Sequence, residues 1–244
     1  MGGLLINPYV FGPIIGAVLF DGTNDYLTRG GDWTGSSDTK TFIVSFWLKI
    51  EGGGGTTRRI LDDTTSFNLV EIDSSDKIRI KLQNVITGTI LDIKSTTSFT
   101  ADGLWHHFMS SGDMAAGTAY LYRDGVEDKT TTTAPVNFSA DWTRTEHSVG
   151  ATTVGGSLLN VDMAEFYFNI ATSLDLSVST NRDKFYNAGR PVSLGADGST
   201  PTGSQPLVYL KHVPGAAATD FGTNLGSGGG MTITGTLTEV TDAP

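Results

Sequence analysis

The chain has 244 residues, a net charge of −10 and no cysteine, which excludes disulfides, thiol catalysis and cysteine-based metal sites. The acidic balance argues against phosphate backbones and anionic membranes as partners, so we expect neither nucleic acid binding nor membrane insertion. Only 17% of the residues are charged, and 31 of the 244 residues are glycine. This composition favours short strands joined by many turns, within one domain.

The beginning of the chain is apolar, because residues 1–20 carry no charged side chain. Pro8 and Pro13 interrupt any helix well short of the roughly 20 residues that a membrane span needs, and a basic signal-peptide region is missing. We therefore expect residues 1–16 to form an extended arm that packs on its own domain or on a partner. The side chains expected to dock on a partner are Leu4, Leu5, Ile6, Tyr9, Phe11, Ile14 and Ile15.

The arm leads into a turn-forming stretch at residues 19–27. Two apolar runs flank five residues that favour tight turns, since Gly22 adopts positive φ at little cost and Asp and Asn bond their own backbone. The stretch predicts a β-hairpin or a kinked strand. Asp21, Asn24 and Asp25 also place oxygen ligands close together, as calcium prefers. Asx turns without an ion explain the same spacing, so we expect no metal or cofactor and keep calcium as an alternative.

Alternating apolar residues predict most of the other elements. The clearest strand is 41–50, where both faces carry apolar residues, as in a central strand that is covered on both sides. Turn signals recur about every ten to twenty residues, which indicates a β-sandwich or barrel. Further strands are expected at residues 67–72, 77–82, 89–94, 104–110, 118–122, 149–150, 163–170, 206–213 and 231–237, and one short helix near 180–188.

Six motifs occur in the order found in laminin G-like domains: LFDGTNDYL at 19–27, FIVSFWLK at 42–49, GLWHHF at 103–108, LYRDGV at 121–126, SVGA at 148–151 and MAEFYFN at 163–169. The chain thus resembles these members of the concanavalin A-like lectin/glucanase superfamily over about residues 17–190. The resemblance implies an all-β jelly-roll sandwich of two antiparallel sheets whose first and last core strands are paired. We expect a single domain over 17–244, with its core at 17–190 and C-terminal strands and loops at 191–244.

A second resemblance concerns the C-terminal part. Residues 190–210 and 224–237 are similar to the tails of laminin G-like proteins that tailed bacteriophages and prophages encode. This resemblance implies a non-enzymatic virion structural protein, such as a capsid decoration or tail or fibre subunit. Such a protein would assemble in the host bacterial cytoplasm as a homo-oligomer, with other virion proteins as partners and with cell-surface glycans as ligands. The alternative is a free carbohydrate-binding lectin.

The sequence departs from the laminin G-like pattern at two positions. Arg123 stands where the family's strand usually carries an apolar residue, so this strand is expected to be exposed or ion-paired. Ala164 precedes Glu165 at a place where an acidic residue is common, which weakens an inherited calcium site.

Catalysis is a distant alternative that rests on Glu71 and Asp73. They resemble the strand of retaining glucanases, in which alternate carboxylates act as nucleophile and acid. Ser75 stands where the general acid is needed, and Asp76 fits only a bulged register. The same residues fit a hairpin turn, so we expect no enzyme.

Two tryptophans are candidate sugar-binding residues. Trp33 and Trp142 lie in polar segments that are expected to be loops, where an exposed ring could stack on a sugar face. We favour the alternative that each caps an end of the core. The motif Trp105-His106-His107 suggests a metal at first sight, but adjacent strand residues point to opposite faces and cannot chelate one ion.

Overall fold

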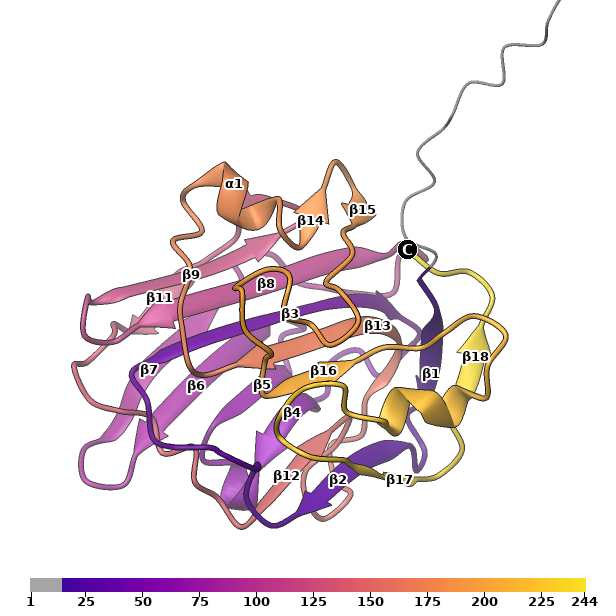
Figure 1. Cartoon of the computed structure of the whole chain (residues 1–244), viewed down its shortest axis with the longest axis horizontal. Helices are drawn as coiled ribbons and strands as arrows, with labels where there is room; N and C mark the ends of the chain where they lie inside the picture. The colour runs from indigo at the N-terminus through magenta and orange to yellow at the C-terminus, as the bar shows by residue number, and fades with distance from the viewer. Residues whose placement is uncertain (1–14) are drawn as a thin grey trace, which may run out of the picture.

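The computed structural model describes residues 15–244, which form two large antiparallel sheets (Figure 1). The first sheet contains, in spatial order, β10 (Val126–Glu127), β9 (Thr118–Arg123), β8 (His106–Asp113), β3 (Thr41–Ile50), β13 (Asn160–Asn169), β1 (Ala17–Asp21) and β18 (Thr238–Val240), and β16 (Val208–Leu210) also pairs with β13. The second contains β11 (Thr130–Thr133), β7 (Gly88–Lys94), β6 (Ile78–Asn84), β5 (Leu69–Ile72), β4 (Arg58–Asp63), β12 (Glu146–Val149), β2 (Tyr26–Gly30) and β17 (Thr232–Thr234). The predicted all-β jelly-roll sandwich is confirmed.

The turn between β1 and β2 carries the chain from one sheet to the other. β1 pairs with β13 in the first sheet, whereas β2 pairs with β12 in the second. The two strands are therefore not a hairpin, and the kinked-strand alternative is the right one. Phe20 and Leu27, one from each strand, are fully buried in the core between the sheets. The pairing of β1 with β13 is the predicted pairing of first and last core strands.

β3 has the predicted bounds and is covered on both faces, as its apolar residues indicated. Phe42 and Phe46 point into the core between the sheets. On the opposite face, Ile43 packs against Tyr167 and Phe185, and Trp47 belongs to a separate small cluster. The first sheet therefore has an additional layer on its outer side.

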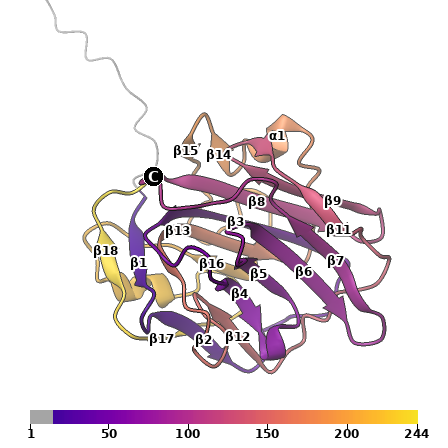
Figure 2. The same cartoon turned by 180° about the vertical axis from the view of Figure 1, so that it is seen from behind.

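This layer comes from the segment that follows β13. It contains α1 (Ser179–Arg182), which is shorter than the predicted helix, and a small hairpin of β14 (Tyr186–Asn187) and β15 (Arg190–Pro191). Figures 1 and 2 show these elements beside β8 and β9, away from β4 to β7. Among residues 15–244, the hydrophobic clusters lie between the sheets or on the outer side of the first sheet. None of these clusters covers the outer face of β4 to β7, so the described residues leave it without an apolar layer.

β4 is a strand that the sequence pattern did not predict. A β-bulge between Arg59 and Leu61 lets Ile60 and Leu61 both enter the core, which breaks the alternation of a regular strand. The strand matters because it brings Arg58, Arg59, Asp62 and Asp63 into the second sheet.

The described residues include the last two residues of the predicted arm, Ile15 and Gly16. Ile15 is buried in the cluster of Ala17, Trp47 and Ala164, and the Gly16 N–H donates to the His212 carbonyl at 3.3 Å. Ile15 thus packs on its own domain rather than on a partner. The other docking candidates, Leu4 to Ile14, lie outside the described residues. No helix within 15–244 has the length and apolarity that a membrane crossing requires.

Candidate ligand face on the second sheet

A row of charged side chains crosses the outer face of β4 to β7. Val70 and Ile80 point into the core, so their neighbours Glu71 and Arg79 point outward. Figure 2 shows the four strands side by side. The row runs from one strand to the next as Arg59, Glu71, Arg79 and Asp92, and we call it the ion ladder.

The members of the ion ladder bind one another closely. Glu71 accepts from Arg59 through Oε2 and from Arg79 Nη1 through Oε1 at 3.1 Å. Arg79 in turn donates from Nη2 and Nε to the two oxygens of Asp92, at 2.6 and 2.9 Å. Such bidentate pairs are geometrically specific and stronger than single hydrogen bonds. The side chains of Glu71 and Asp92 are only 4% and 8% exposed, so these charges depend on their partners.

Lys81 stands on the same face without a partner of its own. It is half-buried, lies opposite Leu69 and Asp92 on the neighbouring strands, and makes no side-chain hydrogen bond or ion pair within residues 15–244. Burial lowers its pKa, and the nearby guanidiniums of Arg79 and Arg59 lower it further, while Asp92 acts in the opposite direction. An anion placed beside Lys81 would relieve this unfavourable environment.

Asp62 lies next to the ion ladder, and one of its carboxylate oxygens accepts no hydrogen bond within residues 15–244. Its Oδ1 lies 3.4 Å from Arg59 Nε, but the geometry is not that of a hydrogen bond, and both atoms are buried without a hydrogen-bond partner within residues 15–244. Burial raises the pKa of Asp62 to about 6, against the effect of Arg59. The face therefore presents the cationic group of Lys81, next to buried polar atoms of Arg59 and Asp62 that have no hydrogen-bond partner within residues 15–244.

Glu71 and Asp73 are not arranged as the catalytic pair of a glycosidase. The Asp73 side chain closes the β5–β6 turn, where Oδ1 accepts from the Ser75 and Lys77 N–H groups and Oδ2 from Lys94 Nζ at 2.8 Å. Burial disfavours its charge, but these bonds prevail and lower the pKa of Asp73. Glu71 is tied to two arginines. Neither carboxyl is set to donate a proton, and the glucanase alternative is not supported.

Comparison with family models decides the classification. Residues 21–175 match the Laminin_G_3 family, described as "Concanavalin A-like lectin/glucanases superfamily". The chain belongs to this family. The resemblance found in the sequence motifs is thereby confirmed, although no curated protein matches the chain.

Several solved structures are similar to the chain at low sequence identity. A protein from Bacteroides ovatus, described as a candidate carbohydrate-binding protein, matches with 14% identity and a TM-score of 0.59. The match covers 94% of this chain and 61% of that one, so the present chain spans less than two thirds of its length. A heptameric SAP-like pentraxin from Limulus polyphemus and domains LG4-5 of the mouse laminin α1 chain match with TM-scores of 0.47 and 0.48, at 12% and 15% identity. These matches cover 68% and 74% of this chain, and 81% and 45% of the others.

The two tryptophans of this laminin G-like domain are core residues. Trp33 is 3% exposed and stacks on His147 with 4.6 Å between ring centroids. Trp142 is 4% exposed and meets Phe168 edge to face at 5.3 Å. Neither ring has a free face, so the sugar-stacking role is contradicted. Both residues instead cap the core, which is the alternative favoured from the sequence.

The same end of the sandwich contains a buried carboxyl that should make stability depend on pH. Burial raises the pKa of Asp63 from 3.8 to about 7, although the Asn68 and Phe67 N–H groups bind its carboxylate. Between pH 4 and pH 7 the folded state then holds a proton that the unfolded state has lost. This contribution is fully present below the unfolded pKa and disappears as the pH rises through the folded pKa.

The measurement is the free energy of unfolding of wild type and Asp63→Asn from pH 4 to pH 7.5. The variant should gain stability relative to wild type as the pH rises, whereas exposed Asp183→Asn should show a constant difference. A pH-independent difference for Asp63→Asn would show that Asp63 does not hold the proton.

The carboxylates of two calcium candidates, Asp21 and Asp25, already accept hydrogen bonds from backbone N–H groups. Asp21 Oδ1 accepts from the Thr23 and Asn24 N–H groups at 2.7 and 3.3 Å. Asp25 is buried and accepts from the Thr236 and Asp21 N–H groups. The part of the chain from 15 to 244 contains no group of three or more His, Asp or Glu residues that could hold a metal ion. These residues shape the corner between the sheets.

The structure also accounts for the two adjacent histidines and for Arg123. His106 lies between Asp124 and Asp102, at 2.6 and 3.0 Å from its ring nitrogens, while His107 points to the other face and contacts Ser45 Oγ at 2.8 Å. The two histidines therefore do not converge. Arg123 is half-buried and has no side-chain hydrogen bond or ion pair in the described chain.

Proposed function

We propose that this chain is a non-enzymatic glycan-binding module that binds acidic polysaccharide on the outer face of β4 to β7. The observation that carries the proposal is Lys81, which has no side-chain partner within residues 15–244, lies beside Arg59 and Arg79, and stands on a face that no apolar layer from the described residues covers. Glycan carboxylates are suited to this place because they would supply the anion that Lys81 lacks. The B. ovatus protein of similar fold, described as a candidate carbohydrate-binding protein, agrees with this reading.

Lys81→Met tests the proposal, because methionine keeps most of the side-chain volume and removes the charge. Binding to polygalacturonate should weaken at least about tenfold, which is about 1.4 kcal/mol. It should also weaken with rising salt, whereas neutral dextran should bind poorly in both proteins. The matched control is Lys184→Met, which removes a lysine near α1. Equal affinity of Lys81→Met and wild type, or preference for dextran, would contradict the proposal.

We further propose that the module is a structural subunit of a phage particle, attached through residues 1–14. What supports this is the sequence: the C-terminal similarity to tails of phage-encoded laminin G-like proteins and an apolar, uncharged N-terminal segment that would otherwise favour aggregation. The subunit would form homo-oligomers and contact other virion proteins. A free lectin is the alternative, and it requires no particle.

Deletion of residues 2–14 separates these two possibilities. It spares Ile15, which packs in the folded domain, so the truncated protein should melt at the same temperature as the full chain. We expect it to be lost from particles when it replaces the full-length protein during assembly. Normal incorporation would rule out attachment through this segment.

A further inference from the structure

A small polar pocket lies on the outer side of the first sheet, on the side of the sandwich opposite the ion ladder. It forms at a bulge in β13 between Ala164 and Tyr167, where Glu165 has a positive φ of 50°. Met163 and Phe166 point into the core, and the bulge leaves Glu165 on the outer side. Backbone strain of this kind persists where the surrounding structure enforces it, and it is common at functional sites.

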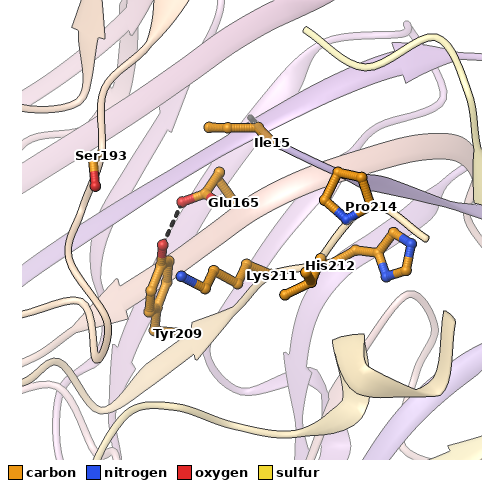
Figure 3. Close-up of a pocket in the computed structure, with 8 residues that line it drawn as sticks. Ile15, Glu165, Ser193, Tyr209, Lys211, His212 and Pro214 are labelled. Atoms are coloured by element: carbon orange, nitrogen blue, oxygen red, sulfur yellow. Dashed lines mark hydrogen bonds between the residues drawn. The ribbon is translucent and has the colours of Figure 1, made fainter. Parts of the chain in front are cut away.

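The pocket has a volume of about 80 Å³ and combines polar and apolar walls. Figure 3 shows Lys211 extending toward the hydrogen-bonded pair of Glu165 and Tyr209. Ile15 and Pro214 form the apolar part of the lining. Since one water needs about 10–15 Å³ by the same measure, the space holds roughly five or six non-hydrogen atoms. The pocket therefore suits a very small molecule and is too small for a sugar ring.

Three polar side chains of the pocket have bonding capacity that the protein does not use. Glu165 is 6% exposed; its Oε2 accepts from the Tyr209 hydroxyl at 2.6 Å, and its Oε1 has no hydrogen-bond partner within residues 15–244. Lys211 Nζ makes no ion pair in that part of the chain, and its one hydrogen bond, to the Gly195 carbonyl, is 3.5 Å long. Two of its three donors are thus left over. Ser193 Oγ accepts from the Gly195 N–H at 3.4 Å, so its own proton is available to a ligand.

The Glu165 carboxyl is able to act as a donor in this pocket. Burial raises the pKa of Glu165 to about 7, against the effects of Tyr209 and Lys211. Burial and the neighbouring Glu165 also raise the pKa of Tyr209, so the phenol keeps its proton and donates it to Oε2. When Glu165 is protonated, its proton therefore belongs on Oε1, the oxygen without a partner.

His212 is the remaining titratable group of the lining, and its charged neighbours lie outside the pocket. Its Nδ1 lies 2.6 Å from Asp220 and its Nε2 lies 3.4 Å from Glu239, and neither carboxylate lines the pocket. Figure 3 shows the His212 ring turned away from Glu165. Among the described lining residues, Lys211 thus supplies the positive charge that has no counterpart.

We propose that this pocket binds a short-chain monocarboxylate such as acetate or propionate. One oxygen of the ligand accepts from Lys211 Nζ, and the other accepts the proton on Glu165 Oε1, so both contacts are charge-assisted hydrogen bonds. The short hydrocarbon end of the ligand packs against Ile15 and Pro214. The site is independent of the proposed acidic-glycan face, since the two lie on opposite sides of the sandwich.

Other small molecules fit these groups less well. An ammonium compound would be repelled by Lys211, and a neutral amide would leave the lysine charge without a counterion. Chloride would pair with Lys211 but would not fill the apolar end of the pocket. Size excludes longer acids, because the pocket holds only a few non-hydrogen atoms.

The first test is an ¹H–¹⁵N NMR titration of the full chain with sodium propionate at pH 6 and constant ionic strength. Sodium chloride, propionamide and ethylammonium chloride serve as comparison ligands. Propionate alone should cause saturable shifts in the amides of Ser193 and residues 209–213. Lys211→Met should weaken propionate binding at least about tenfold, because it removes one partner of a charged hydrogen bond. Lys184→Met should leave the affinity unchanged.

The second test is the pH dependence of propionate affinity. Propionate stays ionised from pH 6 to pH 8, whereas Glu165 loses its proton as the pH rises through its pKa of about 7. Affinity should therefore fall about tenfold over this range, in proportion to the protonated fraction. Glu165→Gln donates from its amide at either pH, so it should bind equally well at both. A dependence that persists in Glu165→Gln would assign the titration to His212 and contradict the role of Glu165.

Three results would overturn the proposal: no saturable shifts with propionate, an equal response to propionamide or ethylammonium, or unchanged propionate affinity in Lys211→Met. The wild-type pH profile and Lys211→Met decide the matter even where Glu165→Gln fails to fold. The two proposed sites are told apart by exchanging the variants. Lys81→Met should bind propionate normally, and Lys211→Met should bind polygalacturonate normally, so failure at one site leaves the other measurable.

Discussion

Replacing Glu71 with alanine should lower the free energy of unfolding by about 3–5 kcal/mol, the cost of leaving buried charges without their partner. Glu71 is the shared anion of Arg59 and Arg79, and Lys81 lies beside them. Removing its carboxylate would leave Arg79 paired with Asp92 and Arg59 beside Asp62, but both guanidiniums would lose the anion that they share. The loss is measured by chemical denaturation of wild type and variant.

The control for Glu71→Ala is Glu127→Ala. Glu127 is half-exposed, and within residues 15–244 its one ion pair is with Lys129 at 3.5 Å, so its removal should change stability by no more than about 0.5 kcal/mol. A loss below about 1 kcal/mol for Glu71→Ala would show that the ion ladder is not needed for stability, since exposed pairs contribute no more than that.

Gly150→Ala should destabilise the domain by about 2–5 kcal/mol, because the new methyl group has neither the backbone conformation nor the space it needs. Gly150 has φ of +92°, and a Cβ atom there would come within 2.6 Å of the Phe20 ring. Phe20 is fully buried at the corner between β1 and β2. The glycine therefore allows the close approach that closes this end of the core.

Gly103→Ala is the matched control for the steric part of that effect. Gly103 has a similar φ of +76°, but a Cβ atom there would meet nothing within 4 Å. Its substitution should cost about 1 kcal/mol from the backbone alone. Equal losses in melting temperature for the two variants would contradict the role assigned to the contact between Gly150 and Phe20.

The sequence carried enough information for the class of fold and for most strands. β3 was predicted to the residue because its alternation is regular and its length is sufficient. β4 was not predicted because its bulge places both Ile60 and Leu61 in the core. Two consecutive buried residues break the alternation of buried and exposed side chains by which a strand is recognised. Around Gly22 the sequence left a hairpin and a kinked strand open, because turn chemistry fixes a local bend but does not say which sheet the next strand joins.

The sequence alone predicts only part of the candidate ligand face. The alternation of β6 places Lys77, Arg79 and Lys81 on its outer side, and this could be read directly. The partners of Arg79 come from β5 and β7, and Arg59 comes from β4, which the sequence pattern did not predict. The environment of Lys81 depends on these cross-strand neighbours, which the sequence does not reveal. Burial of Trp33 and Trp142 was likewise a tertiary property, since polar neighbours in sequence do not prevent a ring from entering the core.

The most direct test of the proposed glycan-binding face is an ¹H–¹⁵N NMR titration with a galacturonate oligosaccharide. We predict that the largest saturable shifts fall on β4 to β7, centred on residues 69–71 and 79–83, and that Lys81→Met abolishes them. Shifts confined to other parts of the domain, or a wild-type spectrum that does not respond to the oligosaccharide, would contradict the account.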